Sequence, residues 1–173
     1  MIAPNRDGLT YISSEASLQK VQELRRLCQA ILVGVDTINI DYPSLSIKQD
    51  GYHQPMIVVL DPTGSIDRRW LLEALNNDRK VTIFCNSEVS IDVAHSLFKQ
   101  YAILGENKAQ NWALIIQQLY IHEVHSVLVE GGAKVATSLI QSNYFDEFWL
   151  FKTPQHLSNS ESVSFDYSDS GYS

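Results

Sequence analysis

The chain has 173 residues, of which 45% are hydrophobic and 19% charged, a balance typical of one soluble globular domain. Its net charge of −7 and its short basic clusters argue against nucleic acid as a partner, because nucleic-acid-binding surfaces normally carry a basic stripe. No apolar run approaches the ~20 residues of a membrane-spanning helix. We therefore expect no membrane partner and a cytoplasmic location. Cys28 and Cys85 lie among apolar residues and are expected to be buried, reduced thiols.

The first predicted element is a helix over residues 14–28, whose apolar residues recur at helical spacing: Leu18, Val21, Leu24 and Cys28. A short apolar run at 30–34 follows and is typical of a strand buried on both faces. Residues 35–48 are polar and contain a proline, which predicts a loop with one helical turn. This loop is expected to lead into a short strand at 45–48.

Further strands and helices are predicted to alternate along the rest of the chain. The predicted strands are 55–60, 81–85, 101–104, 126–129 and 145–151. The predicted helices are 70–75, 89–98, 109–120 and 133–141. This alternation favours an α/β fold with three layers, in which a mostly parallel sheet is flanked by helices. We expect the domain to span residues 1–157, because residues 158–173 contain seven serines and predict a flexible tail.

The most informative local feature is a turn between the predicted strand at 126–129 and the predicted helix at 133–141, with the sequence Glu130-Gly131-Gly132-Ala133. Glycine lets the backbone approach a ligand closely, and the N–H groups at the start of a helix point toward an anion. Ligands of open α/β sheets bind outside the carboxyl ends of strands, so this turn is a candidate phosphate site. A bare Gly-Gly pair is also compatible with a tight turn that binds nothing, and the GxGxxG pattern is absent.

The second candidate feature is the polar segment 34–48, which also follows a predicted buried strand. It offers hydroxyls, carboxylates and the ammonium of Lys48, although a solvated loop would have the same composition. If the two preceding strands are parallel, both segments open at one edge of the sheet. A cleft lined from two sides is the minimum for a small-molecule site. This arrangement requires Thr37 and Gly132 to lie close together.

Several motifs, taken in order, resemble the reductase domain of the bifunctional riboflavin biosynthesis deaminase/reductase family, which has a dihydrofolate-reductase-like fold. Residues 30–34, followed by Thr37, Asp41 and Pro43, are similar to the family string A-I-L-V-G-x-x-T-x-x-x-D-x-P. Shorter matches follow the family's order: Leu24-Arg25, Gln54-Pro55 before Asp61, Leu128-Val129-Glu130-Gly131-Gly132-Ala133 and Phe145-Asp146-Glu147. The resemblance covers roughly residues 10 to 155.

The resemblance implies NADPH-dependent reduction of 5-amino-6-(5-phosphoribosylamino)uracil, with hydride delivered to C1′ of the opened ribose. It implies cofactor contacts from Ser13, Gly34, Thr37, Gly131, Gly132 and Ala133. It implies substrate contacts from Asp41, Lys48 and Glu130. No residue is assigned as a general base, because the cofactor supplies the difficult step and the protein mainly positions the reactants. The family also suggests a homodimer.

The chain departs from the family pattern at three places. Met1-Ile2-Ala3 resembles the end of the family segment S-x-D-G-x-I-A, so the expected fold lacks its first strand, and the strands after Pro154. A missing central strand would leave its neighbours with unpaired backbone groups. The family's P-R-L and L-T-V-R read Pro43-Ser44-Leu45 and Leu45-Ser46-Ile47-Lys48, so two arginines are replaced. The deaminase motifs are absent, and no metal is expected.

These departures leave two alternatives open. The chain could be a non-catalytic remnant or fragment of the fold that binds a ligand or dimerises. It could also be a related reductase with a pterin-like substrate.

Overall fold

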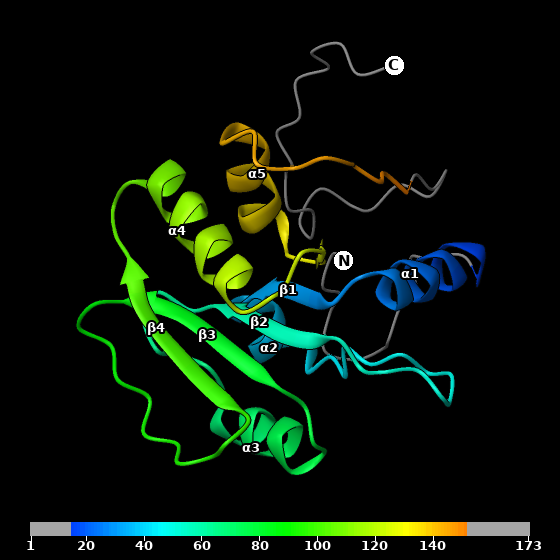
Figure 1. The fold of residues 1–173 in the computed structure, drawn as a ribbon, viewed down its shortest axis with the longest axis horizontal. Helices are drawn as coiled ribbons and strands as arrows, with labels where there is room; N and C mark the ends of the chain where they lie inside the picture. Colours follow the sequence, from blue (N-terminus) through cyan, green and yellow to red (C-terminus); the bar gives the residue numbers. More distant parts are fainter. Residues whose placement is uncertain (1–14, 152–173) are drawn as a thin grey trace.

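A parallel sheet forms the centre of the part of the chain that the computed structural model describes, residues 15–151 (Figure 1). Its strands are β1 (Ala30–Gly34), β2 (Met56–Leu60), β3 (Val81–Asn86), β4 (Phe98–Leu104) and β5 (Val127–Val129). They lie in the order β4-β3-β2-β1-β5, and every neighbouring pair is parallel. The expected α/β fold with a parallel sheet is therefore confirmed.

Helices cover both faces of this sheet and complete three layers. α2 (Val35–Asp41) and α3 (Arg68–Asn76) pack on one face, and α4 (Lys108–Ile121) and α5 (Ala133–Gln141) pack on the other (Figure 1). α1 (Glu15–Leu27) precedes β1 and lies beside its amino end. Among residues 15–151, no helix is long and apolar enough to cross a membrane.

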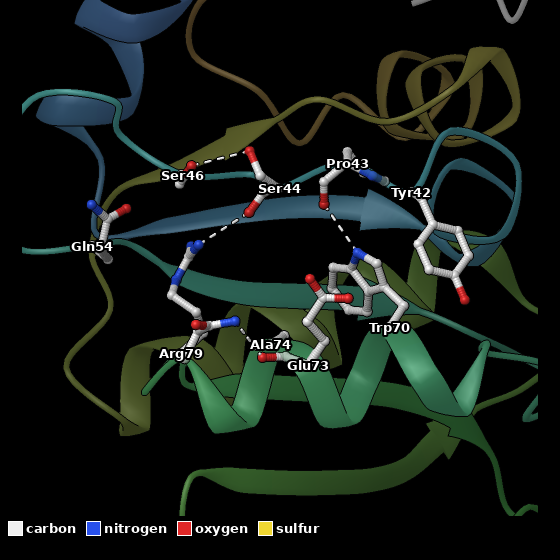
Figure 2. A pocket seen from close by; sticks show the side chains of 10 residues that line it. Tyr42, Pro43, Ser44, Ser46, Gln54, Trp70, Glu73, Ala74 and Arg79 are labelled. Atoms are coloured by element: carbon white, nitrogen blue, oxygen red, sulfur yellow. Dashed lines mark hydrogen bonds between the residues drawn. The ribbon is translucent and has the colours of Figure 1, made fainter.

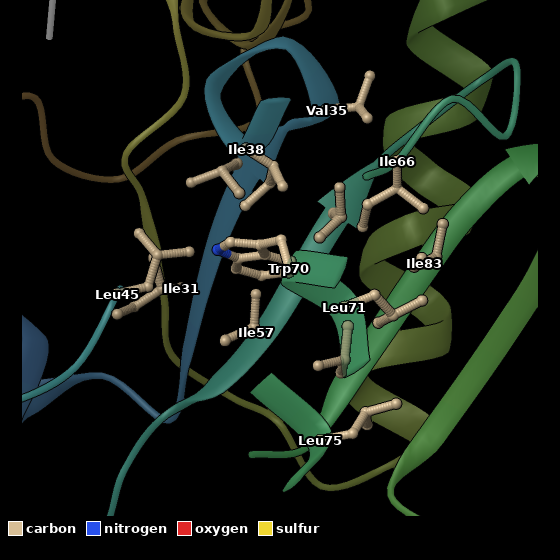
Figure 3. Packing of buried hydrophobic residues seen from close by; sticks show 13 residues of the cluster. Ile31, Val35, Ile38, Leu45, Ile57, Ile66, Trp70, Leu71, Leu75 and Ile83 are labelled. Atoms are coloured by element: carbon tan, nitrogen blue, oxygen red, sulfur yellow. The ribbon is translucent and has the colours of Figure 1, made fainter. Parts of the chain in front are cut away.

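The alternation of side chains along the strands divides the buried residues into two cores. Ile31 and Val33 of β1 face α2 and α3, in a core with Trp70 near its centre (Figure 3). Ala30 and Leu32 face the opposite core with Trp112 of α4. Because both faces of β1 are covered, an uninterrupted apolar run suits this strand, as the sequence predicted.

The segment predicted as a helix at 89–98 is instead an irregular, extended stretch followed by β4, so that prediction is wrong. Its exposure alternates residue by residue, with the odd-numbered positions from 89 to 97 half-buried and the even-numbered ones exposed. Ile91, Val93 and Leu97 pack against the core that contains Trp70. This period of two is typical of an extended chain and outweighs the weaker helical pattern.

The segment 35–48 also differs from its prediction, because α2 is a two-turn helix and no strand forms at 45–48. Leu45 has φ +48, a left-handed conformation that interrupts an extended backbone and costs on the order of 1–3 kcal/mol. Side chains satisfy the backbone in place of a neighbouring strand. The amide of Gln54 donates to Ile47 O (3.0 Å) and accepts from Ile47 N (2.8 Å), and Gln22 Oε1 accepts from Lys48 N (2.9 Å).

The strand predicted at 145–151 does not form either, although its sequence is rich in aromatic residues. It pairs with no strand of the described chain, and its last four residues, Phe148, Trp149, Leu150 and Phe151, are 43–49% exposed. Strand propensity is expressed only beside a partner, which explains the failure. In the described sheet β5 is an edge strand that pairs with β1 alone.

The two cysteines are free and differ in their environment. Cys85 is buried, as expected, whereas Cys28 is only half-buried. Burial raises the pKa of both thiols, and the carboxylates of Glu130 and Glu147 raise that of Cys28 further. Neither is therefore activated as a nucleophile.

We predict that Asp61→Ala destabilises the protein by about 2–3 kcal/mol, or roughly 4–12 °C in Tm. The fully buried Asp61 carboxylate accepts hydrogen bonds from Ser65 N (3.0 Å) and Ile66 N (2.9 Å), and the substitution leaves both donors without an acceptor. Thermal unfolding would measure the change. Glu88→Ala, which removes the same charge from an exposed side chain, should leave Tm nearly unchanged. Equal Tm values for the two variants would contradict the prediction.

Candidate functional site

The two glycine-containing segments lie side by side at the carboxyl ends of β1 and β5. A Cβ atom built on Gly132 would lie 3.6 Å from Thr37 Oγ1. The register of the two strands, with Leu32 opposite Val129, brings both strand ends to the same edge of the sheet. The adjacency of Thr37 and Gly132 that the sequence required is therefore present.

Close packing against Val135, in the first turn of α5, explains two of the glycines. A Cβ atom on Gly131 would lie 2.6 Å from Val135 Cβ, and one on Gly34 would lie 2.9 Å from Val135 Cγ2. Both distances are too short for a side chain. Gly132 differs, since its nearest neighbour lies at an ordinary van der Waals distance. Gly34 and Gly131 therefore let the segments meet, whereas a methyl group on Gly132 would fit against Thr37.

Backbone N–H groups gather at the start of α5. Gly132 is the N-cap, with no side-chain capping hydrogen bond, and its carbonyl accepts from Val135 N (3.1 Å) and Ala136 N (3.2 Å). Within the described part of the chain, the N–H groups of Gly131, Gly132 and Ala133 donate to no protein acceptor. Free donors at a helix N-terminus favour an anion, so this turn can hold a phosphate group.

An exposed ion pair spans the two segments beside this turn. Lys134 Nζ lies 2.9 Å from Asp36 Oδ2, and their side chains are 89% and 64% exposed. Such a pair contributes little to stability. It nevertheless places one cation and one anion next to the free amide donors.

Glu130 is engaged by a partner that the sequence analysis did not assign. Arg25 of α1 donates from Nε to Glu130 Oε1 and from Nη2 to Glu130 Oε2, both at 2.6 Å, and from Nη1 to Ser46 O at 2.9 Å. The side chains of the pair are only 9% and 14% exposed. Arg25 follows Val21 by four positions, so helical spacing places it on the apolar face of α1. The sequence therefore does contain a signal that Arg25 is buried.

The remaining predicted substrate residues do not converge on Glu130. Asp41 ends α2 and is half-buried, and burial raises the pKa of its carboxyl group. Lys48 directly follows residues 42–47, and its side chain is exposed. Within residues 15–151, neither side chain forms a hydrogen bond or ion pair with Glu130. Ser13 lies outside the described residues.

A separate cavity of about 380 Å³ lies between α3 and the segment 42–46 (Figure 2). Trp70 and Arg79 line it from the α3 side, and Tyr42, Ser44 and Ser46 line it from the segment. None of the predicted cofactor residues that the structure describes, Gly34, Thr37, Gly131, Gly132 and Ala133, borders this cavity. The Thr37–Gly132 contact is consequently a separate feature at the edge of the sheet.

Together, fold and site define a parallel α/β domain that carries, at the carboxyl edge of its sheet, a glycine turn whose amide donors have no acceptor among the described residues. The sequence profile of the RibD C-terminal domain matches residues 2–166, and the chain belongs to this family. The expected family resemblance is thus confirmed.

Two curated relatives illustrate the similarity. The riboflavin biosynthesis protein RibD of Aquifex aeolicus is 27% identical over 154 residues, covering 88% of this chain and 42% of that protein. The 2,5-diamino-6-ribosylamino-4(3H)-pyrimidinone 5′-phosphate reductase of Archaeoglobus fulgidus is 29% identical over 164 residues, covering 87% of this chain and 73% of that protein. The chain therefore spans less than half of the RibD relative.

Solved structures agree with this assignment. The deaminase/5-amino-6-(5-phosphoribosylamino)uracil reductase of Thermotoga maritima superposes with a TM-score of 0.64 at 26% identity, covering 80% of this chain and 37% of that one. The riboflavin biosynthesis reductase Rib7 of Saccharomyces cerevisiae gives a TM-score of 0.59 at 19% identity, covering 73% and 58%. The second likeness supports the dihydrofolate-reductase-like fold alone.

We predict unequal losses of stability for alanine at the two adjacent glycines. Gly131→Ala should lose about 1–3 kcal/mol, because its new methyl group overlaps Val135. Gly132→Ala should lose less than about 1 kcal/mol, since φ −63 and ψ 175 suit alanine and the new methyl group would meet Thr37 at an ordinary van der Waals distance. Urea unfolding of both variants would measure the difference. A Gly132→Ala variant less stable than Gly131→Ala would contradict this packing.

We predict that Arg25→Ala costs about 3–5 kcal/mol, because it leaves the Glu130 carboxylate buried and unpaired. The double variant Arg25→Ala/Glu130→Ala should be more stable than the sum of the single losses implies. A double-mutant cycle in urea measures this coupling. Losses that add within about 0.5 kcal/mol would show that the two groups act independently.

Proposed function

We propose that this chain is an NADPH-dependent reductase of a phosphoribosylamino-pyrimidine in riboflavin biosynthesis. The observation that carries the proposal is the contact between Thr37 and Gly132, beside a turn whose amide donors have no protein acceptor in the described chain. A dinucleotide phosphate needs such donors next to an open surface. Membership of the RibD C-terminal domain family supports the same reading.

The cofactor site is assigned to the two glycine segments. We propose that the N–H groups of Gly131, Gly132 and Ala133 bind its phosphates and that the hydroxyl of Thr37 donates a further hydrogen bond. Gly34 contributes by letting the segments approach each other. When bound, the cofactor supplies the hydride that C1′ of the opened ribose receives. Ser13 is retained as a proposed cofactor contact on the family resemblance alone.

The substrate site is assigned to Glu130, Asp41 and Lys48. Arg25 saturates one lone pair on each Glu130 oxygen, and a carboxylate oxygen can accept a second hydrogen bond, so Glu130 can still receive a ribose hydroxyl. Asp41 offers another acceptor for hydroxyl groups. Lys48 is exposed and can meet a phosphate as a point charge. These residues bind and orient the substrate.

The exact pyrimidine is a finer part of the proposal. The Archaeoglobus relative is named for a 2,5-diamino-pyrimidinone substrate, and the Thermotoga structure for a 5-amino-uracil substrate. We propose the uracil compound, on the motif resemblance. Assaying the full chain with each compound in turn would separate the two.

We predict that NADPH quenches tryptophan fluorescence saturably and that Gly132→Ala weakens this binding at least ~10-fold, or about 1.4 kcal/mol. The added methyl group fills the space beside Thr37 without disturbing the fold. Gly105→Ala is the matched control, because Gly105 lies in another loop, between β4 and α4, and a Cβ atom built on it would come no nearer than 4.0 Å to a neighbour, Asn111 Oδ1. It should bind NADPH like the parent protein.

The outcomes distinguish the alternatives. Saturable NADPH binding without turnover of either pyrimidine would contradict the reductase assignment and favour a non-catalytic ligand-binding domain. Turnover of a dihydropterin in place of the pyrimidines would favour the related reductase. If Gly132→Ala and the parent protein bind NADPH with equal affinity, the assignment of the cofactor to this turn is wrong.

A further inference from the structure

Arg79, at the amino end of β3, is a buried cation that the proposed reaction does not use. Its side chain is buried, with the residue only 6% exposed. Nη1 donates to Ser44 O at 3.1 Å, and Nη2 donates to Leu45 O and Pro55 O, each at 2.9 Å. No carboxylate of the described chain forms an ion pair with it. Burial, together with the nearby charge of Arg25, lowers its pKa. A buried cation without a carboxylate is costly, so a reason is needed for its presence.

The segment that Arg79 contacts, residues 42–48, requires external restraint. Tyr42 and Leu45 have φ angles of +46 and +48, which side-chain-bearing residues rarely adopt. Leu45 packs into the core, but the residues on either side of it, Ser44 and Ser46, line the cavity of about 380 Å³. Where such a space exists, packing cannot fix the backbone. Two side chains reach across the cavity in Figure 2: Trp70 Nε1 donates to Pro43 O (3.0 Å), and Arg79 donates to Ser44 O.

Two arginines hold three consecutive carbonyls of this segment. Arg79 binds those of Ser44 and Leu45, and Arg25 binds that of Ser46. Arg25 also binds Glu130, which the proposed function places at the substrate. A shift of Ser44 and Leu45 would displace the Ser46 carbonyl from Arg25. Arg79 therefore influences the Arg25–Glu130 pair through the one peptide unit that separates the carbonyls of Leu45 and Ser46.

We propose that Arg79 is a positioning residue that fixes residues 42–48 and thereby sets the placement of the Arg25–Glu130 pair toward the pyrimidine substrate. This inference rests on the proposed function for its substrate. A planar guanidinium fork reaches three carbonyls at once, whereas an ammonium acts as a point donor. Nε of Arg79 is buried without a hydrogen-bond partner among the described residues, so the contacts to the segment come with a cost in stability.

The test compares Arg79→Met, Arg79→Lys and a core control in the full chain. Arg79→Met preserves much of the side-chain volume and removes all three hydrogen bonds. We expect at least a tenfold rise in KM for the pyrimidine substrate, a change in kcat below threefold, and an NADPH Kd within twofold of the parent. Arg79→Lys should restore part of the KM. Leu75→Val, in the same core region, should lower Tm without changing KM.

Amide hydrogen exchange provides a readout that does not depend on catalysis. Exchange in peptides covering residues 42–48 and 127–130, where Glu130 N donates to Leu32 O (2.9 Å), should accelerate at least tenfold in Arg79→Met and remain unchanged in Leu75→Val. Unchanged KM in Arg79→Met, or exchange that accelerates equally throughout α3 and β3, would overturn the proposal and leave Arg79 a general structural residue.

If the parent protein reduces no pyrimidine, the proposed function fails, and the exchange experiment alone decides whether Arg79 fixes the segment. Acceleration confined to residues 42–48 and 127–130 would then support the positioning role. No acceleration there would refute it.

Discussion

The bidentate ion pair between Arg25 and Glu130 joins three parts of the chain that the sheet holds only weakly together. β5 has three residues and, in the described sheet, one neighbouring strand, so its ladder alone gives the following turn little support. The ion pair connects that turn to α1, and its third hydrogen bond connects it to Ser46. Because the pair is nearly buried, either group without the other would be strongly unfavourable. The turn at Gly131 and the segment at Ser46 are therefore fixed together.

Local sequence signals predicted the parts of the fold that depend on local interactions. The strand, glycine turn and helix at 127–141 are a continuous pattern, and α5 has the predicted bounds. The same holds for β1, whose apolar run reflects burial on both faces. Even the adjacency of Thr37 and Gly132 followed from one rule, namely that the carboxyl ends of parallel strands share an edge.

The remaining features depend on interactions between distant residues, and no local pattern identifies which residues are partners. Arg25 and Glu130 are 105 positions apart, and Arg79 is 35 positions from Ser44. The segment 45–48 has a strand-like composition, but side chains of Gln22 and Gln54 satisfy its backbone instead of a strand. Residues 145–151 lack a neighbouring strand in the described chain. The role of Ser13, the flexible tail at 158–173, the homodimer and the cytoplasmic location stay predictions.

The exposed ion pair of Asp36 and Lys134 has a consequence for any anion that approaches the Gly131–Gly132 turn. Lys134 would attract a phosphate, while Asp36 would repel it and compete for the ammonium group. Both groups are solvated, so dissolved ions screen the attraction and the repulsion alike, with a Debye length of about 8 Å at physiological ionic strength. The attraction of this edge for a phosphate group would then vary with the salt concentration of the medium. Because of these two charged side chains, anion binding at this edge would depend on the ions in the solution as well as on the shape of the turn.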